Sequence, residues 1–303
     1  QESIVSIASP SASTENSPLY NRVMTERQRK FREKYKSNIS PLYNGILHLA
    51  VTYGVGIAGI WWCLSHIENA RWEWLLMIPV FLFGNFVEGF MHMHVMHRRI
   101  DVYALRAIYE RHTREHHQYF TDAEPTMDTT REWRIVFFPW RVLTVVGIGG
   151  VGLGYLASLI FNANAGFIVA MTMMGYYLTY ETFHYCCHVH ENWFVRHMPF
   201  INTIRRHHIL HHNFGIMMKY NMNLSFPIAD WFMGTSDLRR GLIGHLFNGY
   251  SEKHQKEELK PIIAKFRIDD SRVTTDGPQL TAQEQQVINN DLDNPRSTAG
   301  AMA

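Results

Sequence analysis

Histidine is the residue whose type and spacing in this chain most clearly allow chemistry, and 18 of the 303 residues are histidines. His184 and His188 are four residues apart, so on a helix both side chains lie on one face and can bind one metal ion. His208, His211 and His212 can do the same, and we expect His212 to turn aside towards a second ion. Imidazole is neutral near pH 7 and binds iron, zinc, copper and nickel. These five histidines, His184, His188, His208, His211 and His212, therefore predict a metal site.

An earlier stretch repeats this arrangement with slightly different spacings. The chain then has four histidine groups: His92 and His97; His112, His116 and His117; His184 and His188; and His208, His211 and His212. Ten imidazoles exceed what one four-coordinate ion can use, so the sequence predicts two metal ions. Further histidines lie in the same stretches outside the repeated spacing, and we expect structural roles or contacts behind the ligands for them: His94, His190, His197 and His207.

Four apolar stretches must position these histidines, at residues 44–66, 73–91, 139–161 and 166–187. Each has about the 20 residues that a helix needs to cross a bilayer. They form two pairs with short connections, and histidines follow the second stretch of each pair. Seven arginines lie in residues 98–134, which by the positive-inside rule puts the histidines and both termini in the cytoplasm. The predicted fold class is all-α: an integral membrane bundle of four transmembrane helices in two hairpins, with a cytosolic helical cap that holds the dimetal site.

Composition divides the chain into four regions. Residues 1–18 are Ser-rich and are expected to be a disordered tail, and residues 19–43 a basic juxtamembrane helix near anionic lipid. Residues 44–250 form the membrane domain with the histidines. Residues 251–303 form a polar tail, with a charged surface helix at its start and largely disordered from about residue 270. The formal net charge of +2 suggests no nucleic-acid partner, and three cysteines without a Cys-x-x-Cys pair suggest no disulfide framework.

Two acidic residues precede histidine groups at helical spacing. Glu88 lies four residues before His92, and Glu181 lies three residues before His184. Ionisable residues at membrane depth are costly and usually functional. A carboxylate behind the ligands, orienting an imidazole N–H, is the expected role for each. Direct binding of the metal and a position near the membrane interface remain open for both.

The four histidine groups, in this order and beside paired apolar stretches, resemble the fatty acid hydroxylase and sterol desaturase superfamily. The family pattern His-x4-His, His-x2-His-His, His-x3-His, His-x2-His-His maps onto the ten histidines above. The second group departs from this pattern, because His112-x3-His116-His117 is one residue longer. The family pattern therefore does not match at His112. Residues with further similarity are Met127, Asp128, Arg131 and Pro139, and the ADWFMGT segment at 229–235. The resemblance covers about residues 44–240.

This resemblance implies a membrane di-iron oxygenase that hydroxylates a C–H bond of a lipid or fatty-acyl substrate with O2. It implies two iron ions, with zinc as a possible substitute, and makes Asp128 a candidate beside Glu88 and Glu181 for a place behind the ligands. Electrons would come from a separate reductase, ferredoxin or cytochrome, because the glycines of residues 147–154 lie in an apolar span rather than in a dinucleotide-binding turn. We expect a bacterial inner membrane, or the endoplasmic reticulum in a eukaryote.

Three other functions use similar residues. A lipid or sterol desaturase would share the site, and no motif here separates desaturation from hydroxylation. A histidine-rich metal transporter would place its ligands at the bilayer midplane, whereas these histidines lie at the ends of the apolar stretches. A zinc hydrolase of the His-Glu-x-x-His type lacks its motif in this chain. The oxygenase is the preferred expectation, and the substrate, the donor and the oligomeric state stay open.

Overall fold

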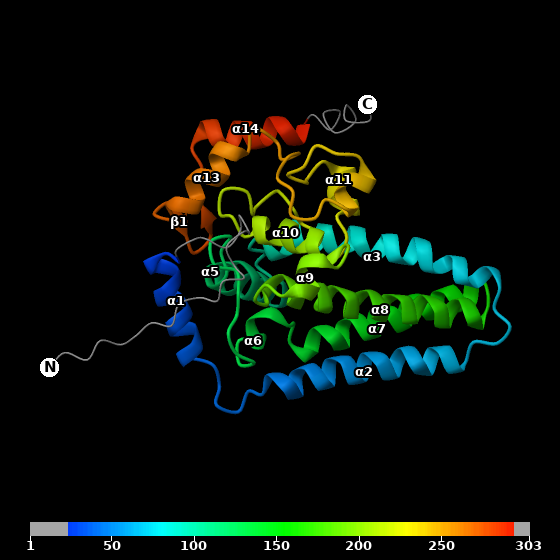
Figure 1. Cartoon of the computed structure of the whole chain (residues 1–303). Coiled ribbons are helices and arrows are strands. Elements are labelled where there is room, and N and C mark those ends of the chain that lie inside the picture. Colours follow the sequence, from blue (N-terminus) through cyan, green and yellow to red (C-terminus); the bar gives the residue numbers. More distant parts are fainter. Residues whose placement is uncertain (1–23, 294–303) are drawn as a thin grey trace.

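The computed structural model describes residues 24–293, and in this range the chain is mostly helical (Figure 1). The expected disordered tail at residues 1–18 lies outside the described residues. One short antiparallel hairpin is present, formed by β1 (Val273–Thr274) and β2 (Gly277–Pro278). The all-α class is therefore confirmed for the described part of the chain.

Four long helices lie side by side in one half of the molecule (Figure 1). They are α2 (Gly45–Ser65), α3 (Met77–Met91), α7 (Trp140–Ile160) and α8 (Ala163–His188), with the 3-10 helix η1 (Trp72–Leu76) before α3. Among the described residues, three segments are long and apolar enough to cross a membrane: Gly45–Ser65, Trp72–Met96 and Trp133–Ile160. Three of the four expected spans are thus supported by length and composition.

Helix α8 does not meet that criterion, and its surroundings explain why. It packs against α2, α3, α7 and α10, so most of its surface is covered by protein. Polar residues such as Thr172, Tyr176 and Glu181 are therefore buried against other helices rather than against lipid. Three of the four predicted transmembrane helices therefore meet the criterion, and α8 is a more polar helix packed among them.

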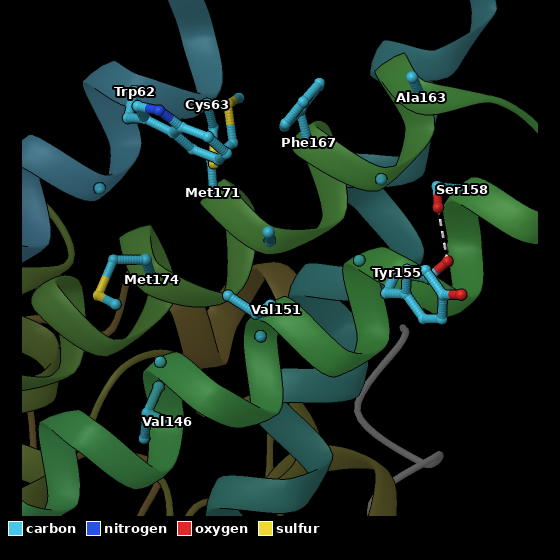
Figure 2. A pocket seen from close by; sticks show the side chains of 16 residues that line it. Trp62, Cys63, Val146, Val151, Tyr155, Ser158, Ala163, Phe167, Met171 and Met174 are labelled. Atoms are coloured by element: carbon cyan, nitrogen blue, oxygen red, sulfur yellow. Dashed lines mark hydrogen bonds between the residues drawn. The ribbon is translucent and has the colours of Figure 1, made fainter. Parts of the chain in front are cut away.

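The hairpin of α7 and α8 depends on small residues. The Asn162 side chain caps α8 by accepting from the Ala165 amide. A Cβ added at Gly154 would lie 2.6 Å from the Gly166 carbonyl oxygen, so the two backbones are in direct contact. These glycines serve helix packing, as expected of the glycine-rich apolar stretch. Beside them α2, α7 and α8 enclose an apolar groove of about 420 Å³, lined by side chains such as Trp62, Val151 and Phe167 (Figure 2).

The other half of the molecule consists of short helices. They are α1 (Glu26–Ser37), α4 (Tyr103–Tyr109), α5 (His117–Tyr119), α6 (Trp133–Val136), α9 (Trp193–His197), α10 (Ile201–His211), α11 (Ile228–Met233), α12 (Leu242–Leu246), α13 (Lys260–Ile268) and α14 (Ala282–Asp293), with two π-helical turns, η2 (His92–Met96) and η3 (Glu110–His116). The basic helix α1 is bound to this half, since Gln28 donates to the Tyr119 carbonyl oxygen and Arg32 pairs with Glu132.

The C-terminal segment differs from the expectation of disorder beyond residue 270. Val273 of β1 and Ile288 of α14 are buried in a cluster with Phe266 of α13. The same cluster contains Phe214 and Tyr220, which lie just after the last histidine group. Residues 270–293 are mostly polar, so their composition did not indicate that a few apolar side chains are buried. These side chains pack the segment against the histidine-bearing half.

Candidate metal centre

Nine of the ten predicted ligands form two compact groups with enough donor atoms for a metal ion each. In each group, one nitrogen per histidine lies within 4.8 Å of all the others. The first group contains His92, His97, His112, His117 and His211, and the second contains His116, His184, His188 and His208. All nine side chains are buried. The groups touch, since the rings of His112 and His116 have centroids 5.3 Å apart.

His212, the tenth, adjoins the second group. Its Nε2 lies 3.0 Å from Nε2 of His208, and its ring stacks on His117 of the first group with centroids 4.3 Å apart. The expectation that His212 would turn aside from His208 and His211 is wrong. His208 on α10 and His212 at its C-terminal cap are four residues apart and share a face, so His211 is the residue that joins the other group.

The inner nitrogens of both groups converge. In the first group, the Nε2 atoms of His92 and His112 are 2.8 Å apart, and those of His97 and His211 are 3.0 Å apart. In the second group, the corresponding distances are 3.2 Å from His116 to His184 and 3.0 Å from His188 to His208. Each group therefore has a centre towards which ring nitrogens point from several directions.

The outer nitrogens show which ring atom carries the proton. Nδ1 bonds to a carbonyl oxygen in five rings: His92 to Met222, His116 to Ile135, His188 to Pro125, His211 to Tyr220 and His212 to Phe120. A carbonyl oxygen only accepts, so each of these Nδ1 atoms donates and the neutral ring keeps a lone pair on Nε2. The Thr113 hydroxyl donates to the Met96 carbonyl oxygen and accepts from Nδ1 of His97 at 3.2 Å.

It follows that His97 and His211 direct two bare Nε2 lone pairs at each other across 3.0 Å. Two acceptors at this distance repel unless a cation lies between them. Protonation would supply one, but burial opposes it: desolvation holds the pKa of both side chains well below the ordinary value, reinforced by neighbouring histidines. In the second group, burial lowers the pKa of His116 to about 3. Neutral imidazoles with converging lone pairs fit a metal ion.

The donor set also restricts the metal. Each group consists of imidazole nitrogens, which suit zinc, copper, iron or nickel and not the oxygen-seeking calcium or magnesium. The first group has five nitrogens, one more than a structural zinc site uses. A transition metal with more than four coordination positions therefore fits the first group better than a closed tetrahedral ion does.

Helix geometry places the histidines of the first group. The amide of His97 donates to the carbonyl oxygen of His92, the i to i+5 bond of a π-helix, and the cap of η3 repeats it between His117 and His112. Residues five apart are thereby stacked on one face. The π turn accommodates the extra residue between His112 and His116, at which the chain departs from the family pattern. His112 thereby joins the first of the two metal-binding groups.

Glu88 and Glu181 accept hydrogen bonds from backbone amides and so hold chain segments near the ligand rings. Glu88 accepts from the amides of Leu224 and Ser225, and so fixes the loop whose Met222 carbonyl oxygen receives His92. Glu181 accepts from the Phe138 amide at 3.2 Å. Both carboxylates support the centre through the chain segments behind it.

A corresponding segment lies behind the second group. Phe138, which Glu181 holds, follows Ile135 by three residues, and the Ile135 carbonyl oxygen accepts from Nδ1 of His116 at 3.0 Å.

Asp128 lies outside both groups: its carboxylate is 56% exposed and pairs with His190 at 2.9 Å. The exposed His197 bonds to the Trp193 carbonyl oxygen, and the partly buried His94 packs on Phe90. None of His94, His190 and His197 joins either group.

The sequence analysis did not predict how polar residues hold the loop behind His92. Asp230 is fully buried and accepts from the amides of Met222 and Asn223 and from Nε2 of His207. Asn85 donates to the Phe226 carbonyl oxygen and accepts from the Ala229 amide. An asparagine within an apolar span was the available signal, since polar groups at membrane depth need partners.

Comparison of the chain with protein-family models, curated proteins and solved structures gives no match.

Proposed function

We propose that this protein is a membrane oxygenase with a dinuclear iron centre that hydroxylates a C–H bond of a lipid-type substrate. The single observation that carries the proposal is the pair of buried, all-imidazole groups in contact with each other. Bound iron at these groups would supply the redox chemistry that activates O2. Hydroxylation puts one oxygen atom into the C–H bond and releases the other as water, with electrons from an external donor and protons from solvent.

The residues of the chain contribute binding, orientation and exclusion of water. Backbone carbonyl oxygens fix the tautomer of five of the imidazoles, so that their Nε2 atoms are ready to bind metal. All ten rings are buried, which keeps water out of the site and protects reactive species from side reactions. These features support a centre for oxidation in a dry pocket.

Lipid is the substrate class that the position of the centre favours. His92 directly follows α3 inside the apolar segment Trp72–Met96, and His184 and His188 end α8. The centre therefore lies at the ends of the long helices, within reach of an acyl chain or another lipophilic molecule in the bilayer. Desaturation would use the same residues and differs only in losing a second hydrogen from the substrate.

The test is turnover by the iron-loaded protein in nanodiscs with lipid extract, a chemical or protein reductant and isotope-labelled O2. We expect a lipid product that carries one labelled oxygen atom, and no such product with His211→Ala. A product that has lost two hydrogens without gaining oxygen would identify a desaturase. Transport of metal ions into liposomes without any oxidised lipid would contradict the proposal and favour a transporter.

A further inference from the structure

Helices α11 and α12 bury polar side chains and expose apolar ones. On α11, Asp230 is fully buried, whereas Phe232 is 68% exposed. On α12, His245 is fully buried, whereas Ile243 is 70% exposed. A helix at the surface of a protein in water has the reverse arrangement, with its polar face outwards. The outer faces of both helices are therefore suited to apolar surroundings.

These faces belong to a larger apolar collar, which we define by six exposed side chains: Trp193, Phe194 and Met198 at α9, Phe232 on α11, and Ile243 and Phe247 at α12. The parts of the collar are in contact. Helix α11 packs against α12, and Phe247 packs on Phe200, close to α9, with ring centroids 4.7 Å apart. An exposed apolar surface of this extent marks a site of interaction with a membrane or a protein.

The collar is continuous with a helix that can span a membrane. Phe232 packs on Phe86 of α3, with ring centroids 5.4 Å apart, and α11 lies beside α3 (Figure 1). Phe86 is ten residues before the end of the apolar segment Trp72–Met96, which at the rise of a helix is roughly 15 Å. Exposed Phe83 and Phe90 continue the apolar surface along α3.

Helix α13 provides the opposite case within the same half of the molecule. It buries Ile262, Ile263 and Phe266, while Lys260 and Lys265 keep 41% and 45% of their side chains exposed. This is the ordinary arrangement for water. The inverted polarity of α11 and α12 is therefore not general in this half of the molecule.

We propose that the apolar collar is inserted into one leaflet of the membrane, so that α9, α11 and α12 form a lipid-covered surface beside α3. Acyl chains would cover Phe232 and Ile243. Trp193, at the start of α9, is 72% exposed and has the amphipathic ring typical of the headgroup level. The proposal does not depend on the metal or on the reaction.

The experiment is spin labelling of the full chain in nanodiscs made of zwitterionic and anionic phospholipid. Phe232→Cys and Ile243→Cys are labelled, with Leu82→Cys on α3 as the lipid-exposed control and Lys265→Cys on α13 as the water-exposed control. The native Cys63, Cys186 and Cys187 are buried, and the unsubstituted chain gives their background labelling. We expect the collar labels to resemble Leu82→Cys, with collisions with O2 several-fold more frequent than collisions with a water-soluble nickel chelate.

Collar labels that behave like Lys265→Cys would overturn the proposal. So would collar labels that neither reagent reaches and that broaden each other's spectra, since these would show a contact between two copies of the chain. Photolysis of a lipid-soluble carbene precursor with the unsubstituted protein gives a second measurement that needs no variant. It should modify Phe232 and Ile243 and leave α13 unmodified, and the reverse pattern would equally refute insertion.

Discussion

The two histidine groups hold similar donors on different helical geometry. In the first, His92 pairs with His97, and His112 with His117, at five-residue spacing on π turns. In the second, His184 and His188 are four residues apart on the regular helix α8. A spacing of five brings two side chains to one face only where a π turn adds a residue to the helix. The first group therefore depends on backbone geometry that the second does not need.

Neither half of the chain builds a group alone. His211, from the second half, completes the first group, and His116, from the first half, belongs to the second. Adjacent histidines produce this exchange, because neighbouring residues on a helix point in different directions: His116 and His117 diverge, and so do His211 and His212. The repeat in the sequence therefore does not match the division of the histidines between the two groups.

The largest effect is expected from removing one ligand of each group. His211→Ala should lower the metal content by about one ion per chain by disabling the first group, and His188→Ala should do the same for the second. Both should abolish the proposed lipid oxidation, which would use an ion at each group. Metal content by mass spectrometry is the measurement, with His254→Ala, a substitution of a histidine outside both groups, as the matched control. Loss of both ions in each variant would show that the groups do not bind independently.

Deleting His94 tests the π turn directly. The deletion brings His92 and His97 to a spacing of four residues and removes the extra residue from η2. We expect both groups to keep their metal, because the π turn then becomes a regular helical turn, in which residues four apart share one face. His94→Ala, which keeps the spacing, is the control and should bind both ions. Loss of metal from the first group after the deletion would contradict this account of the π turn.

Substitution of the supporting carboxylates should have intermediate effects. Glu88→Gln weakens the hold on the loop behind His92, and Glu181→Gln weakens the hold on the segment behind His116. Each should lower the metal affinity of its own group by about 10–100-fold, the usual range for residues behind metal ligands. Competition with a chelator measures this affinity. The same loss at both groups in either variant would argue for general destabilisation instead.

The smallest effect is expected at Asp128. Its exposed pair with His190 contributes little stability, about 0–1 kcal/mol, so Asp128→Asn should keep both ions with only a slight change in unfolding free energy. Metal content and chemical denaturation measure the two quantities. A loss of metal from the second group would restore the role behind the ligands that the family resemblance gives to Asp128.

The sequence was sufficient to predict the helical class and the set of histidines, because ligand types and spacings are visible in single residues. It did not predict which histidine joins which group, since that depends on the rotation of each side chain around its helix and on the π turns. The spacing of five residues at His92 and His112 was the available signal. The polar central helix α8 and the buried anchors Val273 and Ile288 were missed because burial depends on neighbours distant in the sequence.

The most direct test of the central claim is titration of the metal-free protein with Co²⁺, followed by visible absorption and by metal analysis after gel filtration. The two histidine groups predict about two bound ions per chain, with absorption bands typical of nitrogen ligands, and about one ion for His211→Ala. Binding of no cobalt, or equal binding by His211→Ala and the unsubstituted chain, would contradict the assignment of a dinuclear metal centre.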